Sequence, residues 1–216
     1  MEKCFEIKLH KTFDGYLGKL TIDESFFKSN KLSNDSQNGN SFDTIVILDR
    51  SGSMGSDVGR IVNNILSGVF NSLNYDKTII NLITFDSVVN QYFLDINGLI
   101  NAKIYSQGCT QMHPVVDLLY KSITNCDKKN IRILTISDGI LDDQTETLQK
   151  ASSIAEQLKK SYRINSQAIR FFTSENQPDT RGLSAFLQFN NTGHANLVDI
   201  SKVSYVSKYF VIITRF

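Results

Sequence analysis

Oxygen-bearing side chains gather in three short segments of this 216-residue sequence. The first segment follows an apolar run and reads Asp49-Arg50-Ser51-Gly52-Ser53. The second comes just before a predicted helix and reads Gln107-Gly108-Cys109-Thr110. The third again follows an apolar run and reads Ser137-Asp138-Gly139. Spacing of i, i+2 and i+4 can direct one carboxylate and two hydroxyls toward one point where an extended chain turns, and glycine lets the backbone curl there. We predict that five side chains bind one metal ion: Asp49, Ser51, Ser53, Thr110 and Asp138.

The predicted ligands are two carboxylates and three hydroxyls, without an imidazole or a thiolate. Hard oxygen donors of this kind suit Mg²⁺ or Mn²⁺ and disfavour Zn²⁺. Mg²⁺ prefers six ligands and keeps waters readily, so a carboxylate from another molecule can replace one of those waters. The expected chemistry is therefore recognition of an acidic group through a shared metal ion.

Alternating strand and helix patterns place these segments at the ends of strands. Strands are expected at residues 42–48, 78–85, 88–94, 131–137, 165–172 and 195–200, and helices at 57–73, 114–125, 145–160 and 183–189. Only two residues separate the second and third strands, which predicts a tight antiparallel pair. The predicted fold class is α/β: a doubly wound, mostly parallel sheet with one antiparallel edge strand and helices on both faces. Ligands of such sheets bind beyond the carboxyl ends of the strands.

The two ends of the chain differ from this middle part. Residues 1–28 are predicted to form an N-terminal β extension, because apolar and polar residues alternate on both sides of the Asp14-Gly15 turn signal. Residues 29–41 are polar and rich in Asn and Ser, which predicts a linker or mobile loop, with a long ordered loop as the alternative. Residues 42–202 form the α/β domain, and 203–216 are expected to form a strand that pairs with the N-terminal extension. We expect the chain to belong to a longer protein.

Composition excludes several classes of partner. The net charge of +1 provides no strong field toward nucleic acid or an anionic membrane. No apolar run approaches the roughly 20 residues that span a bilayer, and the N-terminus lacks the apolar core of a signal peptide. The three cysteines lack a C-x-x-C spacing, so neither a disulfide scaffold nor a zinc site is expected. A reducing, cytoplasmic location is predicted.

The three segments resemble the von Willebrand factor A domain, also called the integrin I-domain family. Its metal-ion-dependent adhesion site has the pattern D-x-S-x-S, then a threonine after a glycine, then an aspartate that ends a later strand. All five positions match in order, and the resemblance covers about Phe42 to Ile200. It implies that Asp49, Ser51, Ser53 and Thr110 surround Mg²⁺, with Mn²⁺ possible, and that Asp138 acts directly or through water. Cys109 departs from the family pattern, in which a second glycine is common, and the N-terminal extension has no counterpart.

The resemblance implies a module that binds an Asp or Glu of a partner protein through the metal ion, and no enzyme activity is expected. Two alternatives remain open. A metal-dependent hydrolase of the phosphatase type would use Asp49 as its nucleophile, although position 51 is serine and the sequence offers no evident general base. A scaffold or regulatory domain would bind through another surface.

Several neighbouring residues have ordinary structural interpretations. Asp49 to Ser53 could be only a turn and a helix N-cap. Arg50 and His113 are expected to be surface or helix-start residues rather than partner contacts, and Cys109 to be a small buried residue rather than a redox-sensitive neighbour of the metal. His194 is expected to lie in a loop, and Asp142-Asp143 to be an acid pair at a helix start that could also shape the rim of the site.

Overall fold

A computed structural model describes residues 5–12, 15–22, 43–55, 57–66, 79–139, 141–172, 181–192 and 197–201. The chain divides into two compact units, Met1–Asn40 and Ser41–Phe216. The predicted linker at 29–41 and the predicted C-terminal strand within 203–216 lie outside the described residues, and both stay predictions.

The first unit contains a β-hairpin. Strands β1 (Phe5–Thr12) and β2 (Gly15–Ile22) pair antiparallel, from Phe5 opposite Ile22 to Thr12 opposite Gly15. This confirms the hairpin that the alternating pattern and the Asp14-Gly15 turn predict.

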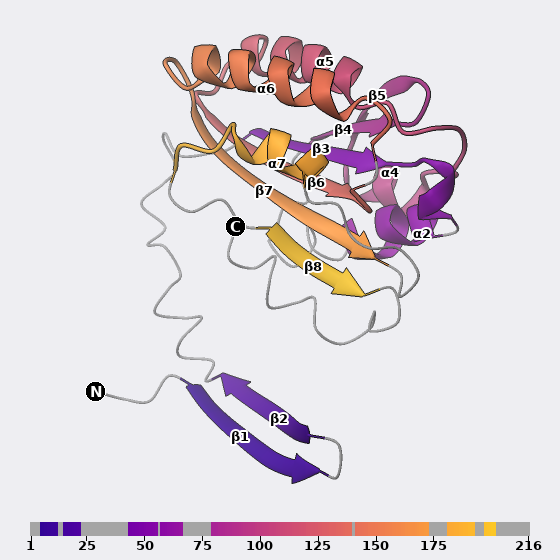
Figure 1. The fold of residues 1–216 in the computed structure, drawn as a ribbon, viewed down its shortest axis with the longest axis vertical. Coiled ribbons are helices and arrows are strands. Elements are labelled where there is room, and N and C mark those ends of the chain that lie inside the picture. The colour runs from indigo at the N-terminus through magenta and orange to yellow at the C-terminus, as the bar shows by residue number, and fades with distance from the viewer. Residues whose placement is uncertain are drawn as a thin grey trace. The chain divides into compact units, whose positions relative to one another are not determined.

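The second unit is built on a six-stranded sheet in the order β5-β4-β3-β6-β7-β8 (Figure 1). Strand β5 is antiparallel to β4, and every other neighbouring pair is parallel. The strands are β3 (Asp43–Asp49), β4 (Ile80–Phe85), β5 (Val89–Leu94), β6 (Asn130–Ser137), β7 (Arg163–Phe172) and β8 (Leu197–Ser201). The predicted mostly parallel sheet with one antiparallel edge strand is confirmed.

Central strand β3 is buried on both faces because its side chains alternate between two apolar cores. Ile45 and Ile47 belong to one core, whereas Val46 and Leu48 belong to the other. All four are at most 1% exposed. This burial explains why the strand is a continuous apolar run rather than an alternating one.

Helices cover both faces of the sheet. The core that includes Ile45 is closed by α5 (His113–Thr124), α6 (Gln144–Leu158) and α7 (Arg181–Leu187), and Figure 1 shows α5 and α6 side by side. The opposite core is closed by α2 (Asp57–Arg60), the π-helical segment that continues it (Ile61–Leu66) and α4 (Ile96–Asn101). In the described part of the chain, no helix has the length and apolar character needed to cross a membrane.

Two helical regions differ from the prediction. The helix expected at 57–73 is α-helical only at Asp57–Arg60 and changes to π-helical geometry at Ile61–Leu66, while the remainder of that prediction lies outside the described residues. Helix α4 was not predicted. Its sequence signal is Asp95, whose side chain caps the helix by accepting a 2.6 Å hydrogen bond from the Gly98 N–H.

The sheet brings the predicted first and third segments to the same edge. Strands β3 and β6 are parallel neighbours with Leu48 opposite Ile136. Asp49 and Asp138 follow these two positions by one and two residues, so both carboxylates emerge at the carboxyl ends of adjacent strands.

Candidate metal centre

Asp49 is the buried centre of the candidate site. Its side chain is fixed by two hydrogen bonds, a 2.8 Å bond that Oδ1 accepts from the Ser51 N–H and a 2.6 Å bond that Oδ2 accepts from the Ser137 hydroxyl. Asp49 is 0% exposed. The carboxylate is therefore held in one orientation at the end of β3.

Burial raises the pKa of Asp49 to about 6, because a carboxylate removed from water is harder to ionise. The hydrogen bonds from Ser137 and Ser51 oppose this rise, and the nearby charge of Asp138 adds to it. A buried carboxylate with a second acidic group beside it is an environment in which a bound cation would stabilise the ionised form.

The turn after β3 brings two hydroxyls together. Ser51 Oγ and Ser53 Oγ lie 3.0 Å apart, and a short 3₁₀ helix at Gly52–Met54 bends the chain between β3 and α2. Met54 is buried in the core with α2 and anchors the turn, while Gly55 ends it with a φ of 59°. The two hydroxyls of the predicted i, i+2, i+4 spacing therefore lie beside one another.

The second segment joins this turn through its backbone. The Gly52 N–H donates to the Gly108 carbonyl at 3.1 Å, and the Gln107 N–H donates to the Arg50 carbonyl at 2.8 Å. Thr110 and Asp138 are each 6% exposed, and the Asp142 N–H donates to the Thr110 carbonyl at 2.9 Å. The three predicted segments therefore meet at one edge of the sheet, and the role of the five side chains as ligands stays a prediction.

The turn between β4 and β5, which the two-residue spacing predicts, is also part of this framework, although no sequence pattern indicated its contact with the second segment. The Ser87 hydroxyl accepts a 3.0 Å hydrogen bond from the Cys109 N–H. It also lies where a side chain at Gly108 would project, 2.7 Å from the position of a Cβ. Gly108 has a φ of 68°, so glycine is required there for both backbone conformation and space.

Arg50 and Cys109 differ from the prediction. Arg50 was expected at the surface, but its side chain is 11% exposed and pairs with Asp86, itself 2% exposed, at 2.9 Å. Cys109 was expected to be buried, but it is exposed because it follows Gly108 over the β4–β5 turn. His113 begins α5 as expected, with its side chain 45% exposed, and His194 lies outside the described residues.

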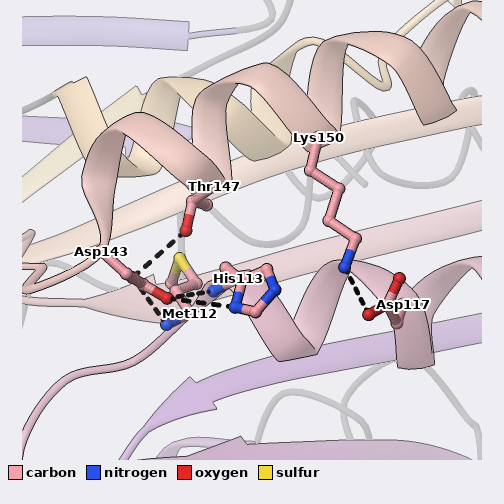
Figure 2. Close-up of polar contacts among 6 residues, drawn as sticks. All are labelled: Met112, His113, Asp117, Asp143, Thr147 and Lys150. Carbon is pink, nitrogen blue, oxygen red and sulfur yellow. Dashed lines mark hydrogen bonds and ion pairs between the residues drawn. The ribbon is translucent and has the colours of Figure 1, made fainter.

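Asp142 and Asp143 directly precede α6, as the acid-pair interpretation expects, but their carboxylates contact the segment that carries Thr110. Asp142 Oδ2 accepts a 2.8 Å hydrogen bond from the Thr110 N–H. Asp143 accepts from the N–H groups of Met112 and His113 at 2.9 and 2.6 Å (Figure 2). Partners about thirty residues apart in sequence leave no local pattern from which these contacts could be predicted.

The donor set fits a hard divalent cation. Carboxylate and hydroxyl oxygens are the ligands that Mg²⁺ and Mn²⁺ accept, and the Ser51 and Ser53 hydroxyls lie beside one another in the turn that follows Asp49. Within the described ranges, no group of three or more His, Cys, Asp and Glu residues could hold a metal ion. A site in this part of the chain would therefore depend on hydroxyls as well as carboxylates.

Comparison with known proteins identifies the fold. No family model matches the sequence, and no curated protein is similar to it. The structure is similar to the PilB minor pilin from Streptococcus sanguinis, with a TM-score of 0.57 and 11% identity over 82% of this chain and 60% of that one. It is also similar to the vWF domain of the type V pili tip protein Mfa5 from Porphyromonas gingivalis, with a TM-score of 0.55 and 12% identity over 81% and 94% of the two chains.

A third similar structure is the manganese-loaded TRAP protein of Plasmodium vivax, with a TM-score of 0.50 and 17% identity over 74% of this chain and 68% of that one. These likenesses show that the fold is that of a von Willebrand factor A domain. The chain spans 60% of the PilB chain, so the activity of a whole protein of that kind does not transfer to it.

Proposed function

We propose that this chain is a protein-interaction module that binds an Asp or Glu of a partner protein through Mg²⁺, with Mn²⁺ able to replace it. The proposed ligands are Asp49, Ser51, Ser53, Thr110 and Asp138. The observation that carries the proposal is the Asp49 carboxylate, which is buried at the end of β3 and oriented by Ser51 and Ser137, with Asp138 close enough to raise its pKa.

Similar structures support this proposal at the level of class. One carries manganese, and another is the vWF domain of a pilus tip protein. In this chain, the bound ion would supply a Lewis acid that accepts one oxygen from the partner. The residues of the chain orient the donors, and Met54, which is buried in the core on one face of β3, anchors the turn that carries Ser51 and Ser53.

A role in binding rather than catalysis is supported by the state of Asp49. A nucleophilic aspartate must reach its substrate, whereas Asp49 is 0% exposed and both carboxylate oxygens accept hydrogen bonds from the protein. We therefore propose that the chain is not an enzyme. A cytoplasmic location is also proposed, and the free thiols of Cys109 and Cys126 are compatible with it.

The test compares two carboxylates of the same strand. Asp49→Ala should abolish Mn²⁺ and Mg²⁺ binding measured by calorimetry, and it should abolish retention of partner proteins on the immobilised domain in Mg²⁺. Asp43→Ala is the matched control, because Asp43 begins β3 at the opposite end and pairs with Lys128 at 3.0 Å.

Undiminished metal affinity in Asp49→Ala would refute the site. Partner retention that persists in EDTA would instead support a scaffold that binds through another surface. Hydrolysis of a generic phosphate ester that Asp49→Asn abolishes would support the enzyme alternative.

A further inference from the structure

Asp142 and the backbone of Thr110 are joined in both directions. The Thr110 N–H donates to Asp142 Oδ2 at 2.8 Å, and the Asp142 N–H donates to the Thr110 carbonyl at 2.9 Å. The two peptide groups that flank the Thr110 α-carbon are thus fixed by one residue. Because a threonine side chain has few rotamers, fixing its backbone fixes the directions in which its hydroxyl can point.

Asp143 makes similar contacts two and three residues further along the same segment. Met112 is the N-cap residue of α5 and offers no side-chain hydrogen bond to the helix. The N–H groups of Met112 and His113 instead donate to the Asp143 carboxylate, which also accepts a 3.2 Å hydrogen bond from the Thr147 hydroxyl of α6 (Figure 2). The start of α5 is therefore capped by a residue from the start of α6.

We propose that Asp142 and Asp143 are positioning residues that hold the Thr110 segment against the connection between β6 and α6, which carries Asp138. The inference rests on the proposed function, since it assigns Thr110 and Asp138 to one metal ion. Asp138 lies only four residues before Asp142, so holding Asp142 against Thr110 keeps the connection that carries Asp138 near a donor 28 positions away in sequence. The donors are then arranged before the ion arrives.

The Mn²⁺ affinities of Asp142→Ala and Asp142→Asn distinguish an effect of position from an effect of charge. Asp142→Ala removes both the acceptor and the charge, whereas Asp142→Asn removes the charge but keeps an oxygen that can accept from the Thr110 N–H. If Asp142 acts by positioning, Asp142→Ala should weaken Mn²⁺ binding about tenfold or more, because loss of a residue that orients a metal ligand commonly has this effect. The Mn²⁺ affinity of Asp142→Asn should stay near that of the wild type. Equal losses in the two variants would mean that Asp142 acts through its charge, and the proposal would be overturned.

The matched control uses the ion pair between Lys150 and Asp117, which also joins α6 to α5 (Figure 2). Asp117→Ala should leave Mn²⁺ affinity unchanged, because this pair does not contact the segment at 110–113. Asp143→Ala should lower Mn²⁺ affinity as Asp142→Ala does. If Asp143→Ala does not fold, the result for Asp142→Ala alone tests the proposal. A loss of affinity in Asp117→Ala equal to that in Asp142→Ala would point to general loosening of the helices and would contradict a specific role.

Amide hydrogen exchange in EDTA tests the positioning independently of metal binding. Asp142→Ala and Asp143→Ala should increase exchange in peptides that cover 108–113, whereas Asp142→Asn and Asp117→Ala should not. If the wild type binds no Mn²⁺ but these peptides respond as expected, the proposed function fails and the hydrogen-bonded positioning stands. If the wild type binds Mn²⁺ and neither affinity nor exchange changes in Asp142→Ala, the positioning inference fails and the proposed function stands.

Discussion

The hydroxyl of Ser137 donates a 2.6 Å hydrogen bond to the carboxylate of Asp49 and thereby joins the carboxyl ends of β6 and β3. The same hydroxyl accepts a 3.0 Å hydrogen bond from the Gly139 N–H. One buried serine therefore orients the central carboxylate of the candidate site and the turn that follows Asp138.

Replacement of Ser137 by alanine should weaken Mn²⁺ binding by about ten- to a hundredfold while the domain stays folded, because Asp49 loses a partner that orients it. Ser166→Ala is the matched control. Ser166 is buried on β7 and donates to the Phe186 carbonyl at 2.8 Å, away from the site.

Both substitutions remove a buried hydroxyl and leave its acceptor without a partner, so each should lower the free energy of unfolding by about 1 to 3 kcal/mol. Only Ser137→Ala should change metal affinity in calorimetry. Equal metal affinities in the two variants would show that Ser137 does not orient Asp49 for binding.

The metal-free domain should lose stability from Asp49 as the pH rises. In the unfolded chain this carboxyl ionises near pH 3.8, whereas burial raises its pKa in the folded chain to about 6. The folded state therefore keeps a proton that the unfolded state releases, so the stabilising contribution is complete below about pH 4 and is lost as the pH rises through 6. The difference amounts to about 3 kcal/mol for a pKa change of this size.

Urea unfolding in EDTA at pH 4.5, 6 and 7.5 measures this effect when the wild type is compared with Asp49→Asn. The asparagine variant should gain stability relative to the wild type as the pH rises. Saturating Mg²⁺ should remove most of the difference, because a cation at the site favours ionised Asp49. A stability difference that does not vary with pH would contradict the burial of an ionisable Asp49.

Much of this architecture follows from the sequence because it depends on local patterns. Apolar runs predict β3 and β6, and parallel pairing of their ends brings Asp49 and Asp138 to one edge. The burial of Arg50 could not be predicted, because it depends on Asp86 from the β4–β5 turn. The bonds from Asp142 and Asp143 to residues 110–113 depend in the same way on pairing between distant segments, for which neither periodicity nor composition carries a signal.

The ion pair between Arg50 and Asp86 leads to a prediction about stability. Arg50→Met leaves Asp86, which is 2% exposed, as a buried charge without its cationic partner. Such a loss typically costs about 3 to 5 kcal/mol of unfolding free energy. The double variant Arg50→Met, Asp86→Asn should recover a large part of that loss, since no charge then remains buried.

Chemical denaturation of the wild type, of each single variant (Arg50→Met and Asp86→Asn) and of the double variant gives the comparison directly. Additive losses in the double variant would mean that the two side chains stabilise the fold independently, and the pair would then have no role in holding the β4–β5 turn against the Asp49 turn.

Substitution of Gly108 tests how closely the β4–β5 turn supports the Thr110 segment. Gly55→Ala is the control for backbone strain alone, because a Cβ at Gly55 would meet nothing within 4 Å, while its φ of 59° and ψ of −146° would cost another residue about 1 to 3 kcal/mol. Gly108→Ala adds a steric contact to the strain of its φ of 68°, because a Cβ at Gly108 would lie 2.7 Å from Ser87 Oγ. The clash should displace the Thr110 segment and lower Mn²⁺ affinity. Ser87→Ala combined with Gly108→Ala removes the clashing oxygen and should restore part of the affinity, and failure of that rescue would show that backbone strain, rather than the contact with Ser87, controls the position of Thr110.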